Sequence, residues 1–180
     1  MANPFETLGL QPAFVLDPAL LEQRQRELNR AVHPDRAGKS PAERRQALNR
    51  SMDINLAYRT LRDPASRAEA LFALLNAPPT ADETLRDPQL LMEMMEQREA
   101  LEDARRSKDV RRLRNMAANM AEREQRVIAA LAEVFAPLLG AEPLSRDRRE
   151  AHLSAARRQL AELRYVRRFA EEVAAFEDEA

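Results

Sequence analysis

The chain has 180 residues, of which 33% are charged and only 4% are aromatic, and its formal net charge is −1. Cysteine is absent, which excludes disulfides and thiolate-bound metals or clusters, and three glycines offer little turn material for a sheet. We therefore predict an all-α protein that holds no cofactor or metal and lacks the basic surplus of a general nucleic-acid binder.

Helix starts share one pattern along the chain, in which a residue that can cap a helix is followed by proline. The pattern occurs at Asp17-Pro18, Ser40-Pro41, Asp63-Pro64 and Asp87-Pro88. The capping oxygen accepts a backbone N–H that would otherwise be unpaired, and proline lacks a donor where none is needed. Ser40 and Glu43 also have the spacing of a capping box. The pattern predicts helices over about 18–32 and 41–62.

The loop between these two helices contains His33, Pro34 and Asp35. Proline fixes its own φ and disfavours helical geometry at the preceding residue, so the first helix is expected to end there and the loop to be stiff. Asp35 then adds a negative charge beside Arg30 and Arg36. By itself the tripeptide is also compatible with a plain polar loop that ends a helix.

A domain boundary is expected at the adjacent prolines 78 and 79, because two prolines in succession cannot propagate a helix. We place the linker at 76–83, between an N-terminal domain at 1–75 and a C-terminal domain at 84–180. Beyond the linker the pattern predicts three helices. The first begins at 84 or 88 and ends at 106, the second covers 108–136, and the third covers 145–177. Breaks between the last two are expected at Pro137, Gly140 and Pro143.

The second and third of these helices each have a single apolar stripe. In the second helix it comprises Leu113, Ala117, Met120, Val127, Leu131, Val134 and Leu138, and is interrupted by Glu124. In the third helix it comprises Leu153, Ala156, Leu160, Leu163, Val166, Ala170 and Val173. One stripe per helix is typical of packing on a single side, so we predict an antiparallel three-helix bundle.

The first helix of this domain has two stripes. Leu90, Met94 and Leu101 form a core stripe on the helical wheel. The second stripe begins apolar and ends acidic, with Leu91, Met92, Met95, Glu96, Glu99 and Asp103. A helix in a small bundle cannot bury both faces, so the second stripe is expected to stay exposed or to bind a partner. The alternative is that its methionines pack on the N-terminal domain or widen the core.

Tyr165 in the last helix lies about 200° from Leu163 on the helical wheel, opposite the core stripe. This position favours an exposed side chain available to a partner. The alternative is a tyrosine whose ring packs on the stems of neighbouring arginines.

The order of several motifs resembles that of a J domain, the module with which J-proteins engage DnaK-type chaperone ATPases. Before the His-Pro-Asp loop comes Phe5-x-x-Leu8-Gly9-Leu10, and after it come Ile54-Asn55-x-Ala57-Tyr58, Leu61-x-Asp63-Pro64 and Arg67-Ala68. Other motifs are similar to the HscB branch, the co-chaperones of iron–sulfur cluster assembly: Leu16-Asp17, Ser51-x-x-Ile54-Asn55, Arg67-Ala68-Glu69 and Leu91-Met92-Glu93. The chain departs from the usual J-domain pattern at two positions. It has Val32 where J domains often have an aromatic residue, and Arg36 where they often have lysine.

The resemblance implies a non-enzymatic co-chaperone. It would stimulate the ATPase of a specialised DnaK/HscA-type chaperone and deliver an IscU-type iron–sulfur scaffold protein to it. Chaperone binding would then involve His33, Pro34, Asp35, Arg24, Arg26, Arg30 and Arg36. Scaffold binding would involve Leu91, Met92, Met95, Glu96, Glu99, Asp103 and Tyr165.

Two other functions stay open: a J-protein that serves a different client of the general DnaK-type chaperone, and a helical nucleic-acid adaptor. The adaptor would use the basic run Arg105, Arg106, Lys108, Arg111, Arg112 and Arg114. Catalysis is disfavoured because the two histidines, His33 and His152, fall in different predicted domains. No stretch has the apolar length of a signal peptide or membrane span, so a cytoplasmic bacterial protein without a membrane partner is expected.

Overall fold

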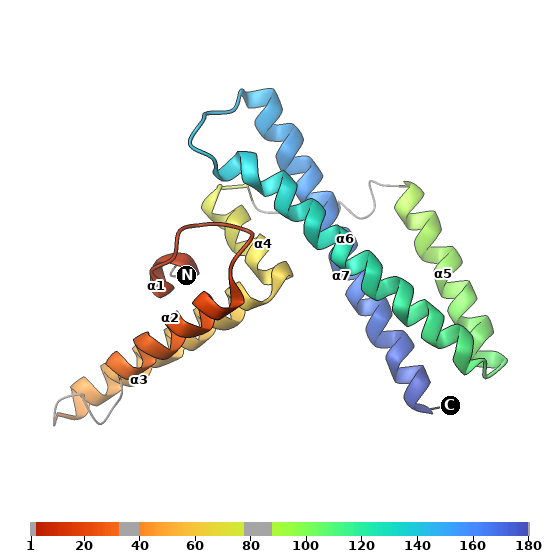
Figure 1. Ribbon diagram of the computed structural model, residues 1–180, viewed down its shortest axis with the longest axis horizontal. Helices are drawn as coiled ribbons and strands as arrows, with labels where there is room; N and C mark the ends of the chain where they lie inside the picture. Colours follow the sequence, from red (N-terminus) through yellow and green to blue (C-terminus); the bar gives the residue numbers. More distant parts are fainter. Residues whose placement is uncertain (1–2, 33–39, 78–87, 180) are drawn as a thin grey trace. The chain divides into compact units, whose positions relative to one another are not determined.

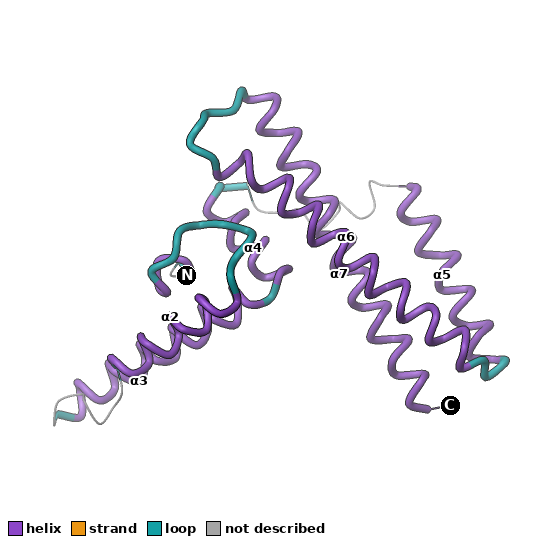
Figure 2. Tube along the Cα trace, in the orientation of Figure 1, coloured by secondary structure: helices purple, strands orange, loops and turns teal. Residues whose placement is uncertain are grey.

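The computed structural model describes residues 3–32, 40–77 and 88–179, and these segments are helical with short connections (Figures 1 and 2). The all-α prediction is therefore confirmed for the described segments. In chain order the helices are α1 (Pro4–Leu8), α2 (Pro18–Ala31), α3 (Pro41–Arg62), α4 (Pro64–Leu74), α5 (Pro88–Arg106), α6 (Val110–Leu139) and α7 (Arg146–Glu179). The chain divides into two compact units, Met1–Pro78 and Pro79–Ala180.

Three of the four predicted helix starts have the expected capping geometry. The Asp17 carboxylate accepts the Ala19 N–H at 2.9 Å, and the Asp63 carboxylate accepts the Ser66 N–H at 2.8 Å. Both halves of the capping box are present at the start of α3. The fourth start, at Asp87, lies outside the described residues. The same cap-and-proline pattern also starts α1 at Asn3-Pro4, a start that was not among the four predicted.

In the N-terminal unit, α2 and α3 lie side by side as a helical hairpin, with α1 packed against both and α4 against α3 (Figure 1). The buried side chains from these helices and the α1–α2 connection form one core: Phe5, Leu8, Phe14, Leu21, Ile54, Leu61, Leu71 and Phe72. The opposite side of α3 exposes three large apolar side chains, Leu48, Met52 and Leu56.

In the C-terminal unit, α6 and α7 pack along their lengths as an antiparallel pair, and α5 packs beside them (Figures 1 and 2). Most of the two predicted stripes is buried, together with Phe135 and Phe169, which the stripes did not include. Glu124 interrupts the α6 stripe because it forms an ion pair with Arg167 of α7, with 2.7 Å between carboxylate and guanidinium.

The predicted bounds of the middle helix need correction. α6 begins at Val110, because the Asp109 carboxylate caps it by accepting the Arg112 N–H at 2.9 Å. It also continues through Pro137 to Leu139. Proline lacks one backbone donor, and in the last turn of a helix this removes little of the hydrogen-bond ladder. Pro137 alone therefore does not end the helix.

Candidate partner-binding surfaces

The four residues of the predicted chaperone-binding loop, His33, Pro34, Asp35 and Arg36, lie outside the described residues. The three predicted arginines of α2 are all exposed, but helix geometry divides them. Arg26 and Arg30 are one turn apart and share a flank of α2, whereas Arg24 lies on the other flank. Arg26 also forms an exposed ion pair with Glu22 at 3.0 Å. The structure therefore groups Arg26 with Arg30, and Arg24 apart from them.

A ladder of polar side chains joins α2 to α3 near their middle. The side-chain amides of Gln25 and Asn29 both donate to Asn55 Oδ1, at 2.9 and 3.0 Å. The Ser51 hydroxyl in turn donates to Asn29 Oδ1 at 3.0 Å. Half-buried hydrogen bonds with fixed partners specify one register between the two helices. Ser51 and Asn55 therefore help to set how α2 and α3 align in the hairpin.

Arg67, which also belongs to the resemblance motifs, has a structural role as well. Its guanidinium donates to the backbone carbonyls of Leu61, Phe14 and Arg62, which joins the end of α3 to the α1–α2 connection. The guanidinium also lies 5.5 Å from the centroid of the Phe14 ring. Burial lowers the pKa of Arg67, and the nearby Asp63 carboxylate partly opposes that shift. Arg67 satisfies carbonyls at a helix end, so it contributes to stability.

The second stripe of α5 is exposed. Leu91, Met92 and Met95 keep 37%, 64% and 59% of their surface accessible, while Leu90 and Leu101 of the core stripe are buried. The acidic end of the stripe, Glu96, Glu99 and Asp103, is also exposed. Three large apolar side chains within two helical turns, followed by carboxylates, form an exposed patch of the kind found at protein–protein contacts.

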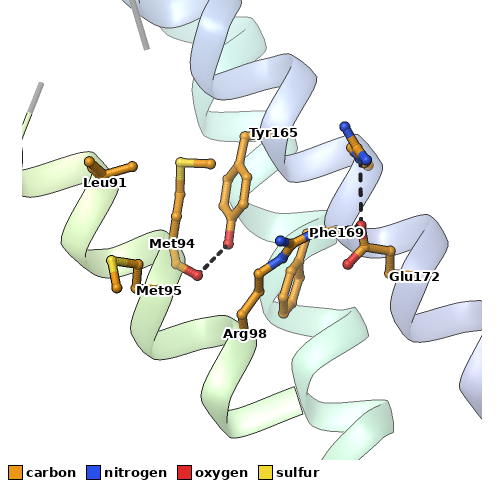
Figure 3. Close-up of a pocket in the computed structure, with 8 residues that line it drawn as sticks. Leu91, Met94, Met95, Arg98, Tyr165, Phe169 and Glu172 are labelled. Carbon is orange, nitrogen blue, oxygen red and sulfur yellow. Dashed lines mark hydrogen bonds and ion pairs between the residues drawn. The ribbon is translucent and has the colours of Figure 1, made fainter. Parts of the chain in front are cut away.

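A cavity of about 280 Å³ lies between α5 and α7, next to this stripe (Figure 3). It is lined by Leu91, Met94, Met95, Arg98, Tyr165, Arg168, Phe169 and Glu172. Three predicted scaffold-binding residues, Leu91, Met95 and Tyr165, thus meet at one place. The structure does not bring Met92, Glu96, Glu99 or Asp103 into the cavity wall.

Tyr165 is half-buried, so the prediction that it points away from the core is wrong. Figure 3 shows its side chain reaching from α7 toward Met94 of α5, and the hydroxyl lies 3.5 Å from the Met94 carbonyl oxygen. The hydroxyl also donates to Gln97 Oε1 at 3.0 Å. Its ring lies 5.8 Å from that of Phe169. Burial raises the pKa of Tyr165 to about 12, although the positive charges of Arg123 and Arg98 oppose the shift.

The other residues that line the cavity were not predicted as site residues from the sequence. Arg98 lies seven residues after Leu91, so extending the second stripe along one side of α5 would have included it. Arg168, Phe169 and Glu172 had no comparable signal. In the second half of α7, the buried side chains of Val166, Phe169 and Val173 belong to a core shared with α5 and α6. A single stripe predicted from the sequence therefore does not include every side chain that faces α5.

Ion pairs hold α5 against the other two helices. Arg123 of α6 binds Glu93 of α5 at 3.0 Å and Glu162 of α7 at 2.7 Å. At the cavity rim, Glu172 of α7 pairs with Arg98 at 3.3 Å and with Arg168 at 3.5 Å. These ion pairs connect α5, which carries the exposed stripe, to both α6 and α7.

Within the described segments, no cluster of three or more His, Cys, Asp or Glu side chains could hold a metal ion. None of the described helices is long and apolar enough to cross a membrane.

Comparison with known proteins gives consistent matches. Residues 86–174 match the sequence model of the family described as "HSCB C-terminal oligomerisation domain". The curated "Co-chaperone protein HscB homolog" of Shewanella halifaxensis (strain HAW-EB4) and that of Shewanella pealeana (strain ATCC 700345 / ANG-SQ1) are each 44% identical over 109 residues. These matches cover 59% of this chain and 63% of the relatives, so they span less than two thirds of those proteins.

Two solved structures extend the similarity over nearly the whole chain. Human co-chaperone protein HscB has a TM-score of 0.79 and covers 97% of this chain and 82% of that one, and at 23% identity it supports the fold alone. Chaperone HscB from Vibrio cholerae is 31% identical, has a TM-score of 0.82 and covers 98% of this chain and 99% of that one. The fold is thus a J domain followed by a three-helix bundle, and this chain belongs to the HscB family of co-chaperones.

Proposed function

We propose that this chain stimulates the ATPase of a specialised DnaK/HscA-type chaperone and delivers an IscU-type iron–sulfur scaffold protein to it. The observation that carries the proposal is the exposed stripe of Leu91, Met92 and Met95, which runs beside a cavity and continues into carboxylates. Membership of a co-chaperone family supports the same function. Neither partner requires the chain to perform chemistry of its own.

The J domain would engage the ATPase. The α2–α3 hairpin is stiffened by the hydrogen bonds of Asn29 and Asn55, and the chain connecting the two helices carries His33, Pro34 and Asp35. In the proposed complex these three residues contact the chaperone, and Arg26 and Arg30 supply positive charge on one flank of α2. Charges at the rim of a contact chiefly raise the association rate and select the partner.

The bundle would hold the scaffold. Leu91, Met92 and Met95 have the most apolar surface to lose on α5, and full burial of such a side chain contributes about 1.5–3 kcal/mol. Methionine adapts to irregular surfaces because its side chain is unbranched and polarizable. The carboxylates of Glu96, Glu99 and Asp103 would then face a basic part of the scaffold.

Joining the two contacts in one chain raises the local concentration of scaffold near the ATPase. The direct test is single-turnover ATP hydrolysis by specialised and general DnaK-type chaperones, with and without this chain and the scaffold. We expect stimulation of the specialised chaperone, enhanced by scaffold. Stimulation of the general chaperone alone would retain the J-domain activity but reject the client, and no stimulation of either would reject the proposal.

The substitution Asp35→Asn should abolish stimulation of the ATPase. It removes the carboxylate of the His-Pro-Asp loop without changing its size, so the melting temperature should stay nearly constant. The measurement is the single-turnover rate at saturating scaffold. Asp53→Asn, the same change at an exposed position of α3, is the matched control and should stimulate like the parent chain. Full stimulation by Asp35→Asn would remove Asp35 from the contact.

Replacing Leu91, Met92 and Met95 together with alanine should lower scaffold affinity about a hundredfold, or about 2.7 kcal/mol. Since all three are exposed, the free energy of unfolding should fall by only about 0.5 kcal/mol per residue. Isothermal titration calorimetry with the scaffold and thermal melts measure the two effects.

The matched control for this variant is the triple alanine substitution of Leu48, Met52 and Leu56, which are 53%, 62% and 55% exposed on α3. It removes a similar amount of exposed apolar surface from the other unit and should bind scaffold normally. Unchanged affinity in the α5 variant would contradict the proposed contact. A large loss of stability would instead mean that the stripe supports the core.

A further inference from the structure

The cavity beside the exposed stripe has an apolar floor. Met94 and Phe169 line it from α5 and α7, and Leu91 and Met95 of the exposed stripe continue its apolar wall. Phe169 is 2% exposed and belongs to the bundle core, so the floor is set by packing that exists without a partner. A cavity with such a floor is preformed, and filling it costs little rearrangement.

The volume of the cavity, about 280 Å³, is below the range of about 300–1,000 Å³ typical of small-molecule sites. Leu91 and Met95, which line it, are also exposed members of the stripe. A space of this size next to an apolar patch suits one large side chain that projects from a protein partner.

The rim of the cavity carries a net positive charge. Arg98 and Arg168 both pair with the single carboxylate of Glu172, so the charged groups that line the cavity sum to +1. The side chains of Arg98 and Arg168 are 62% and 78% exposed and can reach a further anion. Each guanidinium has five N–H donors, and the contact with Glu172 leaves donors for a second carboxylate.

The two flanks of the apolar stripe therefore differ in charge. On the α7 side are Arg98 and Arg168 at the cavity rim, with the exposed Glu102 one turn beyond Arg98. Helix geometry places the exposed acids Glu96 and Asp103 farther from α7, beyond Met92, and Glu99 at the end of the stripe. A partner that lies across α5 with its acidic group toward α7 and its basic group away would match both flanks. In the reverse orientation it would place like charges together, which is penalised.

We propose that this cavity is the anchor site for the scaffold: it takes one large apolar side chain of the scaffold, and Arg98 and Arg168 bind a carboxylate next to that side chain. The inference rests on the proposed function, because it names how the same surface holds its partner. It adds Met94, Arg98, Arg168 and Phe169 to the contact and fixes the direction in which the scaffold lies across α5.

The first test follows methionine methyl groups by NMR while unlabelled IscU-type scaffold is added to the full chain with ¹³C-methyl methionine. Met92 reports on the exposed stripe, Met94 on the cavity, and the buried Met120 serves as an internal reference. We expect the Met94 methyl signal to shift together with that of Met92. A shift of Met92 without Met94 would overturn the anchor inference and leave the proposed function intact. No shift at either would overturn both.

The second test reverses a rim charge. Arg168→Glu should weaken scaffold binding about tenfold, mainly by slowing association, and the difference from the parent should shrink at high salt. Arg158→Glu, an exposed arginine of the same helix that does not line the cavity, is the control and should change affinity less than about twofold. Equal affinities of the two variants would overturn the orientation argued from the charged rim.

A compensating change in the scaffold makes this test specific. If Arg168 binds a carboxylate, one Asp→Lys or Glu→Lys substitution in the scaffold should restore affinity for Arg168→Glu and not for the parent chain. Circular dichroism melts of both variants confirm that the bundle is folded. Failure of every acidic position of the scaffold to restore binding would also overturn the inference.

Discussion

At the scale of the residue, Tyr165 shows how one side chain can connect two helices and also border a binding surface. Its ring packs near Phe169, and its hydroxyl donates to Gln97 on α5. Burial of this phenol disfavours its charged form, which is why its pKa rises to about 12. The ionisation of Tyr165 therefore reports on whether α5 and α7 are in contact.

The difference in absorbance at 295 nm between the parent chain and Tyr165→Phe should show one phenol that ionises near pH 12. The pKa in the folded state lies above the value of about 10 for an unfolded tyrosine. The stabilisation is therefore complete below pH 10 and is lost as the pH rises toward 12, because the unfolded chain releases the proton first. Melts of both proteins from pH 9 to 11.5 should show the advantage of the parent shrinking. A difference curve centred near pH 10 would contradict the burial of Tyr165.

At the scale of the element, α5 is the helix of the bundle that depends most on specific polar contacts. It buries only Leu90, Leu101 and Ala104, whereas α6 and α7 pack on each other along their lengths. The bridge from Arg123 to Glu93 and Glu162 is its clearest link to both neighbours. Helices with few buried side chains open first, and here that helix presents the candidate scaffold surface.

Arg123→Ala should destabilise the bundle by about 2–3 kcal/mol, because it breaks two ion pairs and leaves the half-buried Glu162 carboxylate without this cation. Hydrogen exchange should show the loss of protection first in α5. Arg126→Ala is the control, since Arg126 is a neighbour in α6 whose pair with Glu122 is exposed, and it should cost about 0.5 kcal/mol or less. Equal effects of the two substitutions would mean that the bridge does not hold α5.

At the scale of the whole molecule, the chain consists of two compact units that carry the two proposed contacts separately. Each unit has its own set of buried side chains, with Phe5, Leu61 and Phe72 in the first and Leu131, Leu160 and Phe169 in the second. We propose that the units are independent domains joined by the segment around Pro78 and Pro79. Under this proposal the connection serves to keep scaffold and ATPase together.

The fragment that begins at Thr80 should fold by itself, bind scaffold with the affinity of the full chain, and stimulate no ATPase. Mixing it with the fragment that ends at Ala77 should not restore the scaffold-dependent part of the stimulation, because effective concentration requires one chain. Circular dichroism, calorimetry and single-turnover hydrolysis measure these three properties. An unfolded C-terminal fragment would contradict the proposed domain division.

The sequence by itself determined most of the local structure. Helix starts at Pro18, Pro41 and Pro64 were predictable because capping and the missing proline donor act within four residues. The two faces of α5 were predictable for the same kind of reason, since the residues of one face recur every three or four positions. The exposure of Met92 and Met95 follows from that periodicity.

Only the tertiary structure decided which distant residues meet. Tyr165 and Phe169 face α5 because the second half of α7 packs against two helices, and a wheel drawn from one stripe contains no information about the second neighbour. The bridge through Arg123 and the rim formed by Arg98, Arg168 and Glu172 likewise join residues from different helices. Helix periodicity fixes which side chains share a face, whereas the packing of the bundle fixes what that face meets.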